Sequence, residues 1–191
     1  GMTCMTERPS RIIENIRAIR QRIAAAAVAS GRDPAAIRLM AATKTQPPAL
    51  VNEAIRQGVT LLGENRAQEL LEKYDQYERE GVDIHFIGHL QTNKVRQVVD
   101  KVTMIHSVDS LRLAEEMERQ CAKLSRRMQI LLEVNIGGER SNSGVPPEAA
   151  EALARAVAAM PHLALRGLMT IPPVCDEPQA TEYFTCMNQL M

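Results

Sequence analysis

Strand-like and helix-like stretches alternate along almost the whole chain, and this alternation restricts the possible folds more than any other feature of the sequence. Short apolar runs predict strands at residues 37–44, 60–64, 83–88, 103–107, 129–136 and 163–170. Amphipathic runs predict a first helix at 10–30 and later helices at about 48–57, 65–79, 91–100, 110–124, 146–159 and 177–191. Strict alternation of this kind predicts an α/β fold with a parallel sheet and right-handed crossovers.

No linker, low-complexity tract or charge block divides the chain, so we expect one domain over residues 2–191 and treat Gly1 as a cloning remnant. Each βα unit takes about 25 residues, and from Ile37 onward there is room for roughly six such units. A closed (β/α)8 barrel of the TIM type needs eight. The sequence therefore predicts either an open six-stranded sheet or such a barrel without its last two units, preceded by an N-terminal helix.

The first predicted strand ends in a lysine and is then stopped by Pro47-Pro48. A short apolar run between breakers predicts a strand that is buried on both faces, with Met40, Ala42 and Lys44 on one of them. The carboxyl end of such a strand is where α/β proteins bind ligands, and desolvation there favours a neutral amine that can attack a carbonyl. The alternative is a lysine whose stem lies on the strand end while its ammonium group reaches solvent.

Polar side chains also follow the other predicted strands, which points to one shared pocket. The candidates at these strand ends are Asn65, His85, His89, Asn135 and Met169. Each has a structural alternative: the asparagines as caps or turn residues, the histidines as hydrogen-bonded structural groups, and the methionine as a packing residue. Glu133 shares parity with Asn135, so it points inward and needs a partner or a proton.

Composition limits the classes of partner. The 23 basic and 23 acidic side chains cancel, which argues against nucleic acid or an anionic membrane as the main partner. No apolar run approaches the roughly 20 residues that a bilayer requires, and the polar start is unlike a signal peptide, so we expect a cytoplasmic protein. The cysteines lie far apart and suggest neither a zinc site nor a disulfide framework; they are Cys4, Cys121, Cys175 and Cys186.

Six motifs together resemble one known family. They are Thr43-Lys44-Thr45, Gly63-Glu64-Asn65, the run from His85 to Gln91, His106-Ser107-Val108-Asp109, the run from Val134 to Gly138, and the run from Arg166 to Ile171. In this order and spacing the chain closely resembles the pyridoxal phosphate homeostasis proteins, also described as alanine racemase N-terminal-domain-like, from about residue 10 to the last residue. The resemblance implies a single-domain (β/α)8 barrel of the kind found in fold-type III pyridoxal phosphate enzymes.

The resemblance also implies a cofactor and a site. The lysine at the end of the first strand, Lys44 here, is expected to hold pyridoxal 5′-phosphate (PLP) as a Schiff base. Asn65, Asn135 and Met169 are expected to line the cofactor, and His85 completes the candidate cofactor-binding set. The implied role has no established catalytic turnover: the protein buffers PLP or delivers it, with PLP-dependent apo-enzymes among the expected partners.

Two departures from the family pattern change the expectations. A Ser-Met-Gly-Met-Ser-like strand and an Arg-Ile-Gly-like strand, which supply most phosphate contacts in the family, are absent, so we expect weak or absent cofactor. The missing strands would also leave open sheet edges, from which we expect self-association. The loop after the fifth strand has Asn142 where the family usually has a lysine.

Two alternative functions remain open. One is a fold-type III PLP enzyme such as an amino-acid racemase, which needs a second β-domain and a second acid/base, commonly a tyrosine. The tyrosines here are Tyr74, Tyr77 and Tyr183, all on predicted helices. The other is an inactive, truncated member of the family with a structural or interaction role.

Overall fold

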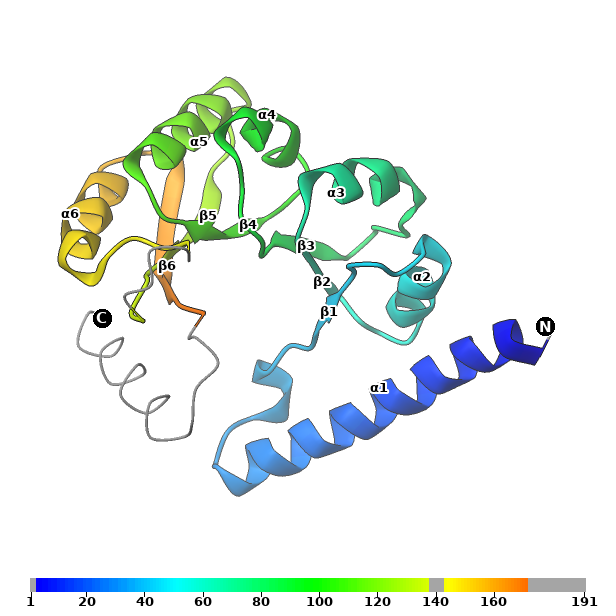
Figure 1. Cartoon of the computed structure of the whole chain (residues 1–191). Helices are drawn as coiled ribbons and strands as arrows, with labels where there is room; N and C mark the ends of the chain where they lie inside the picture. Colours follow the sequence, from blue (N-terminus) through cyan, green and yellow to red (C-terminus); the bar gives the residue numbers. More distant parts are fainter. Residues whose placement is uncertain (1–2, 138–142, 172–191) are drawn as a thin grey trace. The chain divides into compact units, whose positions relative to one another are not determined.

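The structure is a computed structural model that describes residues 3–137 and 143–171, with side chains from Arg11 onward (Figure 1). The chain divides into two compact units, Gly1–Ile84 and His85–Met191. The helix predicted at 177–191 lies outside the described residues.

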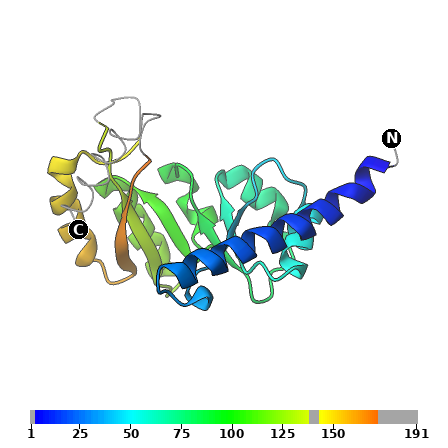
Figure 2. The same cartoon turned by 90° about the horizontal axis from the view of Figure 1, so that it is seen from below.

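The first unit begins with one long helix, α1 (Thr3–Ala29), drawn in blue in Figures 1 and 2. It packs against α2 (Pro48–Arg56), and its Ile16 and Ala27 are buried, as the three- and four-residue spacing of its apolar side chains predicts. Gly31 has φ +75° and follows the end of the helix. The helix starts earlier than the predicted position at residue 10, because a proline inside a helix removes one N–H from the ladder without always ending it.

Two short strands of the first unit pair in parallel. β1 (Met40–Ala42) lies beside β2 (Leu61–Glu64), with Met40 opposite Leu61 and Ala42 opposite Gly63. The predicted first strand, 37–44, was too long at both ends. A 3-10 turn, η1 (Pro34–Ala36), capped by Asp33, comes before it, and Ile37 is 38% exposed and unpaired in the ladder. An apolar composition alone does not distinguish a paired strand from an extended, exposed segment.

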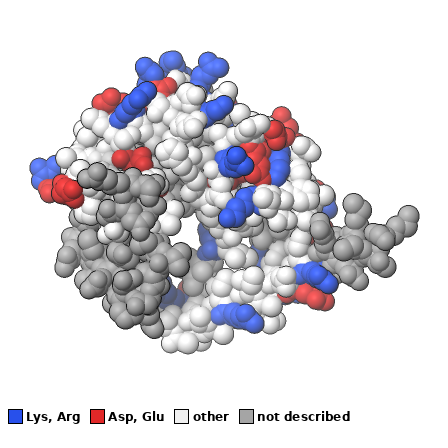
Figure 3. Space-filling model, viewed as in Figure 1, with Lys and Arg blue, Asp and Glu red and all other residues white. Residues whose placement is uncertain are grey.

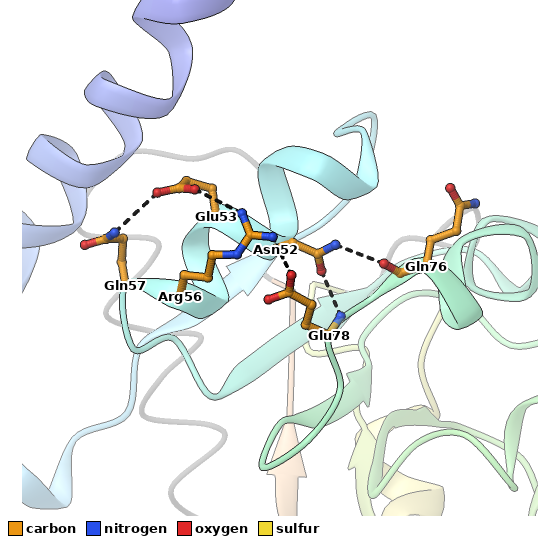
Figure 4. Close-up of polar contacts among 6 residues, drawn as sticks. All are labelled: Asn52, Glu53, Arg56, Gln57, Gln76 and Glu78. Atoms are coloured by element: carbon orange, nitrogen blue, oxygen red, sulfur yellow. Dashed lines mark hydrogen bonds and ion pairs between the residues drawn. The ribbon is translucent and has the colours of Figure 1, made fainter.

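The first unit ends with α3 (Ala67–Lys73) and the 3-10 turn η2 (Tyr74–Gln76). A polar cluster links α2 to the residues around this turn (Figure 4). The Asn52 side chain donates to the carbonyl of Gln76 at 2.9 Å and accepts from the backbone N–H of Glu78 at 2.8 Å. Arg56 bonds to both Glu53 and Glu78, which adds a charged contact to the same link.

The second unit begins within β3 (Asp83–Phe86), whose last two residues, His85 and Phe86, pair in parallel with the next strand. That strand is β4 (Met104–Val108), and β5 (Met128–Glu133) and β6 (Leu163–Met169) follow in parallel in sequence order. The helical segments between them are η3 (Thr92–Lys94), α4 (Val95–Val98), α5 (Leu111–Lys123) and α6 (Pro147–Ala158). Figure 1 shows α4, α5 and α6 on one side of these strands. This is expected, because right-handed connections between parallel strands in sequence order place successive helices on the same side of the sheet.

Side chains alternate between the two faces of β5. Met128, Ile130 and Leu132 have no exposed surface, as expected for the face that the helices cover. Gln129 and Leu131 point the other way and are half-buried. The register of β5 and β6 pairs Leu131 with Gly167 and Glu133 with Met169, so these four residues share the face opposite the helices.

The predicted elements correspond to the observed ones except at their limits. All six predicted strands are present, and the helix predicted at 91–100 is a 3-10 turn followed by a single α-helical turn. On the face shown in Figure 3, acidic and basic side chains are interspersed, in agreement with the balanced charge. No helix in the described part of the chain has the length and apolar character needed to cross a membrane.

Candidate functional site

Lys44 lies in a turn two residues after the last residue of β1, and its side chain is exposed. The prediction that this strand is buried on both faces and desolvates the lysine is wrong for this structure. Ala42, on the same face, is also exposed, whereas Met40 at the start of the three-residue β1 is half-buried. In the described residues Lys44 has no hydrogen bond or ion pair, so its amine is accessible to a ligand.

The neighbours of Lys44 are anchored although the lysine itself is exposed. Thr43 is buried, and both its N–H and its hydroxyl donate to the carbonyl of Gly63, at 3.1 and 3.2 Å. Thr45 has φ +62°, and its N–H donates to the Glu69 carboxylate at 3.1 Å. Lys73 also bonds to that carboxylate, at 2.6 Å. The backbone on both sides of Lys44 is therefore fixed.

Asn65 lies at the same end of the ladder as Lys44. Ala42 of β1 pairs with Gly63 of β2. Lys44 comes two residues after Ala42, and Asn65 comes two residues after Gly63. Asn65 is half-buried, and the N-cap of α3 is Arg66, so the alternative of a helix cap for Asn65 does not hold. An amine and an amide thus extend from neighbouring strand ends of the first unit.

In the second unit, His85 of β3 lies against His106 of β4. Nδ1 of His85 and Nε2 of His106 are 3.0 Å apart, so one of these nitrogens carries the hydrogen and the other accepts it. Burial lowers the pKa of the His106 imidazole. The interpretation of His85 as a hydrogen-bonded histidine is confirmed, and its candidate role toward a cofactor stays a prediction.

Hydrogen bonds join Ser143 and Gly144, in the loop after β5, to residues at the carboxyl ends of β5 and β4. Glu133 is buried and accepts a hydrogen bond from the Ser143 hydroxyl, so the expectation that this carboxylate has a partner is confirmed. The Asp109 carboxylate, just after β4, accepts from the N–H of Gly144 at 3.1 Å. The Asn135 N–H donates to the carbonyl of Val145 at 2.9 Å. Asn135 therefore lies on a backbone segment held from both sides.

Met169 is the last residue of β6 and pairs in register with Glu133. It is half-buried on the face opposite the helices, and the hydroxyl of the next residue, Thr170, donates to the carbonyl of Val134 at 2.8 Å. Met169 and Asn135 thus both lie at the carboxyl ends of strands in the second unit. The loop position predicted to differ from the family, Asn142, is outside the described residues.

The sequence did not single out two buried groups near the turn that contains Lys44, the Glu64 carboxyl and the Tyr77 phenol. Glu64, the last residue of β2, has no exposed surface and accepts a hydrogen bond from the Tyr77 hydroxyl at 2.8 Å. Burial raises the pKa of Glu64 more than its hydrogen bonds with Thr43 and Tyr77 lower it. Glu64 and Leu62 are two residues apart in β2 and so lie on the same face of the strand. Because Leu62 is fully buried, this spacing could have predicted that Glu64 is buried too.

The groups of the first unit fit an aldehyde cofactor. A primary amine without an ion pair can condense with an aldehyde, and the small Ala42 on the same face leaves space beside it. The Asn65 amide can donate and accept hydrogen bonds to polar groups of a bound ring. Lys44 and Asn65 belong to the first unit, and His85, Asn135 and Met169 belong to the second.

Comparison with known proteins identifies a relationship over nearly the whole chain. Residues 9–191 match the family model described as "Alanine racemase, N-terminal domain". The "Pyridoxal phosphate homeostasis protein" of Aquifex aeolicus is 38% identical over 185 residues, which are 96% of this chain and 78% of that protein. The protein of the same name from Pseudomonas aeruginosa is 40% identical, over 95% of this chain and 80% of its own length.

Solved structures show the same fold. An unknown protein from Bifidobacterium adolescentis superposes with a TM-score of 0.87 at 35% identity, covering 96% of this chain and 79% of that one. PipY of Synechococcus elongatus, in a structure with PLP bound, superposes with a TM-score of 0.75 at 29% identity. That match covers 94% of this chain and 81% of PipY. The predicted barrel-type α/β fold of the alanine racemase N-terminal domain is confirmed by these matches and by the parallel strands.

Proposed function

Because this chain belongs to the family of the pyridoxal phosphate homeostasis proteins, we propose that it binds PLP and takes part in intracellular PLP homeostasis. The observation that carries the proposal is the exposed amine of Lys44, which has no ion pair in the described residues and follows an anchored strand end. The PLP-bound structure of PipY supports the same cofactor.

The proposed linkage is a Schiff base on Lys44. The Nζ amine attacks the aldehyde carbon of PLP, a C=N bond forms, and the aldehyde oxygen leaves as one molecule of water. Addition of water reverses the step and releases the cofactor without any other reactant. A reversible bond of this kind suits a protein that stores PLP and passes it on, with PLP-dependent apo-enzymes as the proposed recipients.

The remaining candidate residues have proposed supporting roles. Asn65 would hydrogen-bond to the cofactor beside Lys44, from the neighbouring strand end. In the second unit, Asn135 and Met169 are proposed as further cofactor contacts by the family resemblance, and His85 is proposed as one from its position in the third strand. No catalytic residue is proposed: the named relatives are homeostasis proteins, and binding with slow release accounts for such a role.

A titration of the purified protein with PLP tests this function. We expect a saturable visible absorption band in the wild-type protein that is absent in Lys44→Ala. Lys123→Ala is the matched control, because Lys123 is an exposed lysine in the last turn of α5, away from the strand ends. Equal spectra for Lys44→Ala and the wild-type protein would contradict the Schiff base on Lys44, and the absence of any saturable band in the wild-type protein would contradict PLP binding.

A further inference from the structure

A buried acid ends the second strand, directly behind the proposed site. Glu64 has no exposed surface, and its Oε1 accepts a hydrogen bond from Tyr77. Its Oε2 is buried without a well-formed hydrogen bond in the part of the chain that the structure describes. A buried carboxyl oxygen of this kind is costly, so its presence at a strand end needs an explanation.

Tyr77 is held in place from α2 by the cluster in Figure 4. Asn52 bonds to the residues on either side of it, through the carbonyl of Gln76 at 2.9 Å and the N–H of Glu78 at 2.8 Å. Arg56 pairs with the Glu78 side chain as well. The phenol of Tyr77, which is 4% exposed, therefore meets the Glu64 carboxyl at a fixed position.

Thr43, at the end of β1, lies opposite Glu64. Ala42 pairs with Gly63, so the next residues along the two strands, Thr43 and Glu64, lie opposite each other. Both are buried, whereas Ala42 and Lys44 are exposed, so the acid lies on the face of the strands opposite the lysine. The Tyr77 hydroxyl donates to the Glu64 carboxyl at 2.8 Å, and the Thr43 hydroxyl donates to the carbonyl of Gly63, the residue before Glu64.

The charged groups near Glu64 within the first unit come from α3. The Glu69 carboxylate favours the protonated form of Glu64, and the Lys73 ammonium opposes it. These two groups form an ion pair with each other at 2.6 Å, and burial is the largest influence on the Glu64 carboxyl. The protonated acid can donate from one oxygen while the other accepts from Tyr77.

We propose that Glu64 is a positioning residue, which holds the end of β2 through its hydrogen bond with Tyr77, opposite Thr43 of β1, and so fixes how Lys44 and Asn65 are presented to PLP. The inference rests on the proposed function, because it assigns a role relative to the same cofactor. Side chains that lock the residues in contact with a ligand are a recurrent requirement of precise sites. Glu64 itself does not touch the cofactor.

The test compares three variants of the full chain for PLP affinity and for the circular dichroism induced in the bound cofactor, which reports its orientation. Glu64→Ala removes both hydrogen-bonding oxygens, and we expect roughly tenfold weaker PLP binding and an altered dichroism band. Glu64→Gln keeps the shape of the side chain and an acceptor for Tyr77, so we expect it to restore both values. Val59→Ala is the control, because Val59 is buried just before the other end of β2 and its truncation costs stability alone.

Tyr77→Phe covers the case in which Glu64→Ala does not fold, since it removes only the hydroxyl that donates to Glu64. We expect weaker binding and an altered dichroism band in this variant too. Normal affinity and dichroism in Glu64→Ala, or in Tyr77→Phe if the first variant is unfolded, would overturn the inference, as would an equal loss in Val59→Ala. A wild-type protein that binds no PLP would instead overturn the proposed function.

Discussion

The backbone N–H of Thr45 donates a hydrogen bond of 3.1 Å to the carboxylate of Glu69, which fixes the turn immediately after the proposed PLP lysine. Thr45 adopts φ +62°, a left-handed conformation that is unfavourable for a β-branched residue. The same carboxylate pairs with Lys73, and both side chains are mostly buried, at 16% and 17% exposure. A partly buried charge thus stabilises an unfavourable backbone conformation next to Lys44.

Glu69→Ala should lower both stability and the rate of PLP capture. It removes the acceptor for Thr45 and leaves the Lys73 ammonium without its carboxylate, which we expect to cost about 2 kcal/mol in the free energy of unfolding. Urea denaturation measures the first effect, and stopped-flow absorption after mixing with PLP measures the second. The control is Glu151→Ala, whose pair with Arg155 has the same spacing and the same 2.6 Å distance but is exposed. We expect that control to cost less than about 0.5 kcal/mol; equal costs would contradict the account.

Replacing Glu64 with glutamine should change how stability depends on pH. Burial raises the pKa of Glu64 above its ordinary value of 4.5 in the folded protein. As the pH rises from 4.5 toward that raised pKa, the unfolded chain releases a proton that the folded chain keeps, so wild-type stability falls by up to about 1.4 kcal/mol per pH unit. Glu64→Gln cannot titrate, so its stability should rise relative to wild type through this range. Unfolding curves at a series of pH values measure the difference, and parallel pH profiles would show that the pKa of Glu64 is not raised.

The titration of His106 should make the stability of the protein depend on pH in the opposite direction. Burial lowers the pKa of its imidazole below the ordinary value of 6.5. As the pH falls below 6.5, the unfolded chain takes up a proton that the folded chain does not, so stability is lost toward acid pH. His106→Asn removes the titration, and its thermal midpoint should depend less on pH than that of wild type between about pH 7.5 and pH 5.5. A His106 resonance in NMR that titrates near 6.5 would contradict this prediction.

Gly144 should not tolerate a side chain. Its φ is +118°, and a Cβ atom would lie 2.7 Å from the backbone N of Asn135 and 3.0 Å from the carbonyl carbon of Val134. We expect Gly144→Ala to cost about 2–4 kcal/mol and to weaken PLP binding by displacing Asn135. Gly81→Ala is the matched control: Gly81 also has positive φ, +71°, but open space around it, so its cost should be about 1 kcal/mol. Equal unfolding free energies for the two variants would show that the contact with Asn135 is absent.

Hydrophobic patterning predicted which elements form better than where they begin and end. The spacing that includes Ile12 and Ile16 identified α1, and the apolar runs identified all six strands. The run from Ile37 suggested a longer strand than the three residues of β1, because pattern does not record which residues find a ladder partner. The register and the exposure of a strand depend on the segment that lies beside it in the fold. That segment can be far away in the sequence, so the residues of the strand itself do not predict it.

The sequence predicted which residues lie at the candidate site, but it did not predict how exposed they are or which side chains they contact. Strand-end position identified Lys44 and Asn65, and the register of β1 and β2 confirms that both lie at the same end of the two strands. The predicted burial of Lys44 was wrong, since Ala42 and Lys44 are both exposed, and the burial of a strand depends on segments that an apolar run does not specify. The contact of Glu64 with Tyr77 joins residues thirteen positions apart, and such pairing is fixed by the fold and not by local sequence.

Borohydride reduction followed by peptide mass spectrometry shows whether Lys44 alone captures PLP. Reduction converts a Schiff base into a stable secondary amine at the lysine that carried the cofactor. The account predicts one stoichiometric adduct, on the peptide that contains Lys44, and none in Lys44→Ala. An adduct concentrated on another lysine, or spread over the surface lysines in proportion to their exposure, would contradict it.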